Sequence, residues 1–140
     1  YLWARKEFQN ISKCYDCGIS VVKPRHVSKN ILIMDFEGND GKPENTLLES
    51  KVDKNDYLQS ITLISDLFKK AKLVHGDFSE YNIFKTKNGL KLFDLGSAVD
   101  TTHPNTMNFL KRDINNITNF FVKRGLTVEN PADILERIIK

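Results

Sequence analysis

Residues 73–94, LVHGDFSEYNIFKTKNGLKLFD, carry the polar residues from which the class of protein is predicted. This stretch places Asp77 after a short apolar segment, Asn82 five residues later, and Asp94 at the end of a second apolar segment. Phosphoryl transfer needs such a set. One carboxylate must orient a hydroxyl or water and accept its proton, while an amide oxygen and another carboxylate hold Mg²⁺ against the phosphates. Together and in this order, the three residues indicate a phosphate-transfer site rather than ordinary polar loop groups.

The first part of the chain is predicted to form one helix and two strands. The helix is expected over residues 2–16, where apolar residues recur at helical spacing: Ala4, Phe8, Ile11 and Tyr15. Gly18 is its expected stop. Strands are expected at 19–27 and 31–36, and the second opens on an apolar run typical of a strand buried on both faces. A stretch rich in Gly, Asp, Asn and Pro, residues 37–45, is the predicted linker.

The second part is predicted to be mainly helical. A helix over residues 53–71 presents one apolar face, made by Tyr57, Ile61, Ile64 and Phe68. Two short strands follow near 82–85 and 90–94, joined by an Asn88-Gly89 turn. Pro104 is expected to open a helix of about 18 residues, and Pro131 a short last one with Asn130 as its N-cap.

The bulk composition narrows the class of protein. The chain has 140 residues, of which 40% are hydrophobic, and a net charge of +3, so it can bury a core and tolerates a phosphate-rich partner without requiring one. It has no apolar run of membrane-spanning length. Cys14 and Cys17 are its only cysteines, which excludes a disulfide framework and favours a reducing compartment. Without further ligands at suitable spacing, these thiols are expected to pack or lie at the surface rather than bind zinc.

The pattern H-G-D-x-x-x-x-N…D resembles the catalytic loop and metal-binding aspartate of the protein-kinase-like superfamily. Carried over by residue, the resemblance implies that Asp77 is the catalytic base and that Asn82 and Asp94 are the metal ligands. His75 is interpreted as a structural support of the loop. Several phosphotransferase groups share the H-G-D form, including aminoglycoside and choline phosphotransferases, so the flanking residues must choose between them.

Four segments are similar to the RIO family of atypical serine/threonine kinases, and best fit its RIO-one subfamily. They are HGDFSEYN at 75–82, WARKEFQNI at 3–11, ILIMDFEGNDGKP at 31–43, and HPNTMNFLKRDINNITNFFVKRG at 103–125. The last is the most specific, because it stands in place of the long activation segment of ordinary protein kinases. The resemblance implies an α+β, protein-kinase-like, two-lobed fold, with residues 1–36 as an incomplete small lobe, 37–52 as hinge and linker, and 53–140 as a mainly helical large lobe.

The resemblance also implies supporting roles. Glu7 would pair with the ATP-binding lysine of the small lobe. Met34 would back the adenine pocket, and the hinge Asp35, Phe36 and Glu37 would meet the adenine through its backbone. Asp113 is expected to accept hydrogen bonds from the catalytic-loop backbone, although a helix-end carboxylate favoured by the dipole remains its plain alternative. Ser79 and Glu80, beside the base, are candidates for positioning phosphate or acceptor.

Two departures from the family pattern bear on activity. No glycine-rich loop and no strand lysine precede the first helix, so the sequence is expected to be part of a longer kinase, with loss of these parts as the alternative. This chain alone is expected to bind ATP weakly or not at all. The usual Pro-Ala-Pro after the hinge is here Pro43-Glu44-Asn45.

By resemblance, the expected function is that of a Mg²⁺-ATP-dependent (or Mn²⁺-dependent) serine/threonine kinase and ATPase in small ribosomal subunit maturation. Its expected partner is a pre-ribosomal particle of protein and rRNA, in the cytoplasm with shuttling to the nucleus left open; the oligomeric state is not specified. The short region between Asp94 and Pro104 favours ATP turnover as a switch over broad protein phosphorylation. Two alternatives remain: a small-molecule phosphotransferase of the aminoglycoside or choline type, and a non-catalytic pseudokinase that serves as a binding module.

Overall fold

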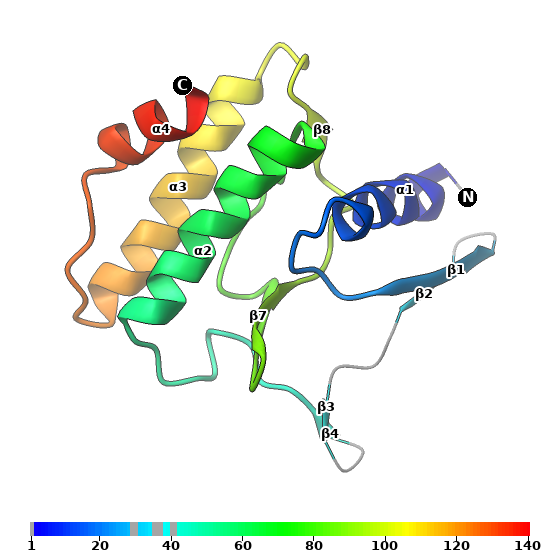
Figure 1. Ribbon diagram of the computed structural model, residues 1–140, viewed down its shortest axis with the longest axis horizontal. Coiled ribbons are helices and arrows are strands. Elements are labelled where there is room, and N and C mark those ends of the chain that lie inside the picture. The colour runs from blue at the N-terminus through cyan, green and yellow to red at the C-terminus, as the bar shows by residue number, and fades with distance from the viewer. Residues whose placement is uncertain (1, 29–30, 35–37, 40–41) are drawn as a thin grey trace.

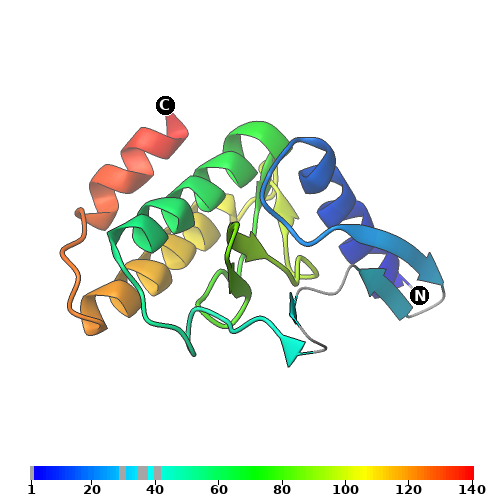
Figure 2. The same cartoon turned by 60° about the horizontal axis from the view of Figure 1, so that its bottom comes forward.

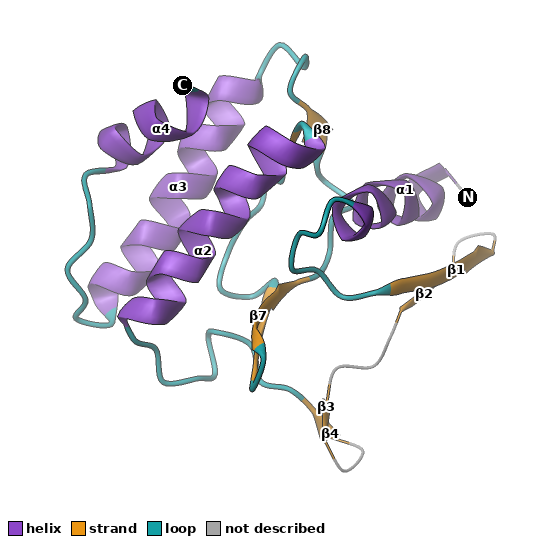
Figure 3. Cartoon of the chain, viewed as in Figure 1, coloured by secondary structure: helices purple, strands orange, loops and turns teal. Residues whose placement is uncertain are grey.

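The computed structural model describes residues 2–28, 31–34, 38–39 and 42–140 (Figure 1). Three helices gather on one side: α2 (Lys54–Asp66), α3 (Thr106–Lys123) and α4 (Pro131–Ile139). On the other side, α1 (Leu2–Asp16) lies beside a two-stranded sheet, and a small hairpin stands between the two groups (Figures 1 and 2). Helices and small antiparallel sheets are therefore mixed, as Figure 3 shows by colour, which confirms the predicted α+β class.

All described strand pairs are short and antiparallel. They are β1 (Pro24–Ser28) with β2 (Ile31–Met34), β3 (Gly38–Asn39) with β4 (Lys42–Pro43), β5 (Leu73–Val74) with β8 (Val99–Asp100), and β6 (Ile83–Thr86) with β7 (Gly89–Leu92). The predicted hairpin is thus present one or two residues from its expected bounds. Gly89, at the start of β7, has a φ of 112°, which a residue with a side chain rarely adopts.

The helices match their predicted ranges with two differences. The Asn130 side chain caps α4 by accepting a hydrogen bond from the Ala132 N–H, as expected. The helix predicted over 53–71 changes character after Asp66, because residues Leu67–Ala71 continue as a π-helix that ends at left-handed Lys72. The helix expected to open at Pro104 begins at Thr106, since residues 103–105 form a turn in which the Thr106 N–H donates to the His103 carbonyl.

The strand expected over residues 19–27 was wrong in its first half. There the backbone pairs with the small hairpin instead: the Val22 N–H donates to the Leu92 carbonyl at 3.0 Å, and the Leu92 N–H donates to the Ser20 carbonyl at 3.0 Å. Only Pro24–Ser28 pairs with β2. The expected burial of the apolar run 31–34, and the strand residues 35–36, lie outside what the structure describes.

The buried face of α1 also differs from the expected one. Ala4 and Ile11 are buried as predicted, but Tyr15 is 41% exposed and the face continues through Cys14. The turn between Ala4 and Ile11 buries a carboxylate, Glu7. Apolar spacing alone missed this face, because one of its members is charged. Both cysteines are free thiols, and burial raises the pKa of Cys14 to about 12.

One apolar core joins α1, the small hairpin and the helices, so the site described below rests on a continuous support. Its largest fully buried side chains include Phe78, Phe121, Ile11, Leu92 and Ile117. The predicted apolar face of α2 contributes Tyr57, Ile61 and Ile64, with Phe68 packed at the edge. Within the described ranges, no helix has both the length and the apolar character needed to cross a membrane.

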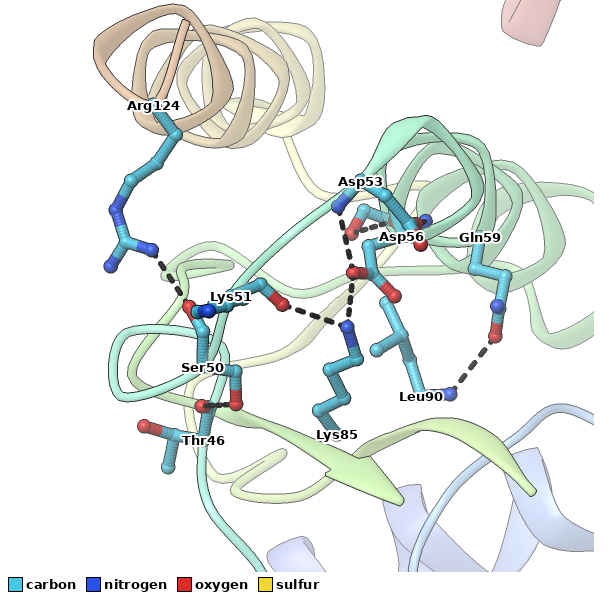
Figure 4. Close-up of polar contacts among 10 residues, drawn as sticks. Thr46, Ser50, Lys51, Asp53, Asp56, Gln59, Lys85, Leu90 and Arg124 are labelled. Atoms are coloured by element: carbon cyan, nitrogen blue, oxygen red, sulfur yellow. Dashed lines mark hydrogen bonds and ion pairs between the residues drawn. The ribbon is translucent and has the colours of Figure 1, made fainter. Parts of the chain in front are cut away.

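The segment from Thr46 to Asp53 is tied to three elements (Figure 4). From β6, the Lys85 ammonium donates to the Lys51 carbonyl at 2.8 Å and pairs with the Asp56 carboxylate of α2 at 2.7 Å. From the end of α3, Arg124 donates to the Ser50 carbonyl at 2.8 Å and to the Leu48 carbonyl. Asp53 and Asp56 cap α2 reciprocally. This segment therefore belongs structurally to the helical side of the molecule.

Because Phe121 is buried in the core and Val122 is exposed, alanine substitution at these two neighbouring positions should change protein stability by very different amounts. Its ring is fully buried and meets Tyr57 edge-on at 5.5 Å between centroids. Phe121→Ala should lower the free energy of unfolding by about 3–5 kcal/mol in urea denaturation, because it leaves a cavity. Val122→Ala, at the next position and 52% exposed, should change it by no more than about 0.5 kcal/mol. Similar losses for both variants would contradict the described core.

Candidate active site

The loop from His75 to Asn82, called here the catalytic loop, is hydrogen-bonded to a buried carboxylate of α3. Asp113 is 1% exposed and accepts hydrogen bonds from the Gly76 N–H at 2.9 Å and the Phe78 N–H at 3.1 Å. The contact expected of Asp113 is therefore present. Burial raises the pKa of Asp113, while these two N–H groups oppose the rise. Because the residues on either side of Asp77 are bound, the backbone at Asp77 is fixed.

His75 supports the loop from inside. It is 1% exposed, and its Nδ1 accepts a hydrogen bond from the Asp77 N–H at 3.1 Å. Its Nε2 is buried and has no hydrogen-bond partner in the described part of the chain. Burial lowers the pKa of His75, and the Asp113 carboxylate works against that shift. A neutral imidazole that accepts through Nδ1 fits the structural role expected of His75.

Asn82 connects the loop at Asp77 with the segment that precedes Asp94. Its side-chain Nδ2 donates to the Asp77 backbone carbonyl at 2.8 Å, and its backbone carbonyl accepts from the Phe93 N–H at 3.0 Å. The first bond orients the amide so that Oδ1 remains available as an oxygen ligand. The second bond places the residue before Asp94 beside the loop. The structure thus brings Asp77, Asn82 and Asp94, which are far apart in an extended chain, into one neighbourhood.

Asp94 stands at a backbone position that few residues adopt. Its φ is 62°, in the left-handed region where Asp and Asn are tolerated better than other residues with side chains. Directly after it, the turn 95–98 is covered by α1: the Asn10 Nδ2 donates to the Leu95 carbonyl at 3.0 Å, and the Trp3 ring lies against Gly96. Asn10 belongs to the WARKEFQNI segment that resembles the family, but sequence reasoning gave its side chain no role.

Glu7 lies near this turn, on the buried face of α1. It is 5% exposed, and burial together with the Asp94 charge raises its pKa, while a backbone hydrogen bond at Leu95 opposes the rise. The Glu7 and Asp94 carboxylates therefore repel each other electrostatically. A cation there would be favoured by both, although the lysine that the family resemblance pairs with Glu7 is not in this sequence.

The residues fit a Mg²⁺ site by donor chemistry. Asn82 and Asp94 offer hard oxygen ligands, and Mg²⁺ bound with a nucleotide needs only one or two from the protein. Among the described residues, no group of three or more His, Cys, Asp and Glu side chains could hold a metal alone. The predicted adenine contacts Asp35, Phe36 and Glu37, and the side chain of Met34, lie outside the described residues.

Beside the catalytic loop, a groove of about 560 Å³ opens toward α3. Asp77, Ser79 and Glu80 line one wall, so the two residues predicted to flank the base do share its surroundings. Ser79 also shapes the loop, since its carbonyl accepts from the Asn82 N–H at 3.0 Å. Arg112, which donates to the Gly76 carbonyl, is a further support that sequence reasoning missed.

Comparison with known proteins places the chain among kinases. A family model described as a RIO domain matches residues 1–134. The chain is 37% identical over 141 residues to the serine/threonine-protein kinase rio1 of Dictyostelium discoideum, and 32% identical over 142 residues to the serine/threonine-protein kinase RIO1 of Caenorhabditis elegans. These alignments cover 98% and 99% of this chain, but 25% and 28% of those proteins. The chain therefore spans about a quarter of the length of these relatives.

Solved structures of a Rio2 kinase share the fold. The Rio2 kinase of Chaetomium thermophilum, solved as an ADP/Mg²⁺-phosphoaspartate complex, superposes with a TM-score of 0.78 at 26% identity. The superposition covers 96% of this chain and 44% of that one. A second structure of the Rio2 kinase from the same organism gives a TM-score of 0.77. The kinase-like α+β fold and the family resemblance predicted from sequence are both confirmed.

Because Asp113 accepts two hydrogen bonds from the catalytic loop, substituting it should destabilise the protein, most of all at that loop. Asp113→Asn would keep one acceptor oxygen and turn an NH₂ group toward the other backbone N–H, so it should cost about 1.5–3 kcal/mol of unfolding free energy. Hydrogen exchange should quicken most at the Gly76 and Phe78 amides. Asp16→Asn, at an exposed helix end, is the matched control. Unchanged exchange at both amides in the Asp113 variant would show that the carboxylate does not hold the loop.

The buried charge at Glu7 predicts that neutralisation stabilises the protein. A carboxylate whose pKa is raised in the fold disfavours folding when ionised, and this penalty disappears as the pH falls through the raised pKa. Glu7→Gln should therefore raise the Tm at neutral pH, and the difference from wild type should shrink on acidification. Thermal unfolding across pH measures this, with Glu44→Gln as the control. A lower Tm for Glu7→Gln at neutral pH would contradict the described surroundings of Glu7.

Proposed function

This chain belongs to the RIO family of serine/threonine protein kinases, and from that premise we propose that it carries the reaction centre of a Mg²⁺- and ATP-dependent phosphotransferase. One observation carries the proposal. The buried Asp113 carboxylate fixes the loop so that Asp77 faces an open groove, while Asn82 bonds the same loop and adjoins the Asp94 segment. A base and two metal-binding oxygens then surround one reacting phosphate.

The proposed reaction moves one phosphoryl group. The Asp77 carboxylate orients the acceptor hydroxyl and takes its proton as the hydroxyl oxygen bonds to the γ-phosphorus of ATP. The bond between the γ-phosphorus and the bridging oxygen breaks, and ADP leaves. Bound Mg²⁺ neutralises charge on the phosphates. Asn82 would hold it through Oδ1 and Asp94 through its carboxylate. With water in place of the hydroxyl, the same groups support ATP hydrolysis.

The remaining predicted contacts keep the same roles in this proposal. Glu7 would pair with an ATP-binding lysine, Met34 would back the adenine, and Asp35, Phe36 and Glu37 would meet it by backbone. The ADP and Mg²⁺ named for the Rio2 structure support this choice of ligands. The lobe division at 1–36, 37–52 and 53–140 belongs to the proposal as well.

The biological role proposed is maturation of the small ribosomal subunit, with a pre-ribosomal particle as partner and a mainly cytoplasmic location. Family membership supports this role. The short connection from Asp94 to α3, in which β8 and one turn replace a long activation segment, supports ATP turnover as a conformational switch and a narrow choice of acceptor.

Substitutions at Asp77 and Asp94 test whether the first acts as the base and the second as a Mg²⁺ ligand. In the full-length protein, Asp77→Asn should lower the rate of phosphate release from ATP by about 10²- to 10⁴-fold, because the proton acceptor is lost. Asp94→Asn keeps the left-handed backbone but removes charge, so it should raise the Mg²⁺ concentration needed for half-maximal rate. Asp16→Asn is the control for both. Wild-type rates in Asp77→Asn would remove that residue from the mechanism.

A further inference from the structure

The groove beside the catalytic loop extends well beyond Asp77. Its far wall is the C-terminal half of α3, and Leu48 and Tyr81 form its rim, 38% and 61% exposed. None of the residues between Asp94 and α3 lines this groove. An acceptor hydroxyl that approaches Asp77 from the groove must lie along α3.

Three groove-lining side chains of α3 lie on one face of the helix. Asn116, Asn119 and Lys123 are spaced by three and four residues, which aligns them along the axis. Each asparagine side chain offers both a donor and an acceptor, the pair of groups that a peptide backbone presents. The face therefore suits an extended peptide that runs beside the helix.

Charge is divided along the groove. Asp77 and Glu80 supply carboxylates from the catalytic loop, and Lys123 and Arg124 supply cations from the helix end. Arg124 is committed to the Leu48 and Ser50 carbonyls and lies 4.8 Å from the centroid of the Phe120 ring. Within the described part of the chain, Lys123 has no ion-pair partner. Lys123 is thus the cation left to meet a ligand, and the carboxylates disfavour negative charge next to the reacting hydroxyl.

The helix sets the distance between the two ends. The backbone on either side of Asp77 is hydrogen-bonded to Asp113. Lys123 lies ten residues after Asp113 on α3, about 15 Å further along the helix axis. A lysine side chain leans back toward the helix N-terminus by a few ångströms, which leaves a span of about 10–12 Å. An extended peptide covers that span in about three or four residues.

We propose that the groove binds the phosphate acceptor as an extended peptide in which an acidic side chain stands about three or four residues from the phosphorylated serine or threonine. Lys123 forms an ion pair with that acidic side chain, and Asn116 and Asn119 hydrogen-bond the peptide backbone between the acidic residue and the phosphorylated residue. A nucleic acid fits less well, because its evenly spaced phosphates would also lie against Asp77 and Glu80. This proposal rests on the proposed function of Asp77 and adds its substrate class.

The test uses the full-length protein and synthetic serine peptides with one aspartate moved stepwise to either side of the serine. Peptides with aspartate about three or four residues away should show a kcat/KM about threefold to tenfold above the all-neutral peptide. Lys123→Glu should reverse this preference and favour a peptide with lysine at that position. Lys111→Glu, the same change on an exposed part of α3 outside the groove, should leave the preference intact.

Binding of the same labelled peptides, measured by fluorescence anisotropy, separates the inference from the proposed function. Absent phosphate transfer with acidic preference still dependent on Lys123 would overturn the proposed function alone. Equal binding and equal rates for acidic and neutral peptides would overturn the inference, as would a preference unchanged by Lys123→Glu. Tighter Lys123-dependent binding of a single-stranded RNA oligomer than of any peptide would also overturn it.

Discussion

A single buried carboxylate organises the region around Asp77. Asp113 is taken out of water by the packing of α3, and its two oxygens are occupied by backbone N–H groups from the loop above. An unpaired carboxylate at that depth would be costly, so the loop and the helix stabilise each other's position. Arg112 adds a bond to the Gly76 carbonyl from the neighbouring position of the helix. The loop is thus attached to α3 rather than merely connected by chain.

That attachment explains how a small chain can position reactive groups from distant segments. Once the loop is fixed, Asn82 bonds it from within and draws the end of the β6–β7 hairpin toward Asp77. From the opposite side, α1 contacts the turn after Asp94 through Asn10 and brings the Glu7 charge close. α1, the hairpin and α3 thus each bond to a loop segment of the site, and each contributes a polar group that is costly to bury alone.

The helices and the order of the site residues were predictable from sequence, whereas the contacts between distant segments were not. Helices with strong caps and apolar spacing, such as α4 behind Asn130, were found nearly to the residue. The order of Asp77, Asn82 and Asp94 predicted that the three lie together, because phosphate transfer limits which groups can serve, and their segments are hydrogen-bonded to one another. Contacts between segments were harder to predict: Ser20 and Val22 pair with Leu92, 72 and 70 residues away, and no local pattern encodes that choice. The burial of Glu7 was hidden for a similar reason, since its cost is offset only by the assembled site.

The left-handed backbone at residue 94 restricts what evolution can place there. Glycine, asparagine and aspartate adopt this conformation with least strain, and only aspartate among them carries a negative charge. Glutamate would supply the charge but not fit the backbone, whereas asparagine would fit the backbone and lose the charge. The left-handed backbone and the charge needed for the proposed Mg²⁺ role are thus both satisfied only by aspartate. A descendant that no longer needs this proposed role is expected to drift first to asparagine or glycine at this position, with its fold intact.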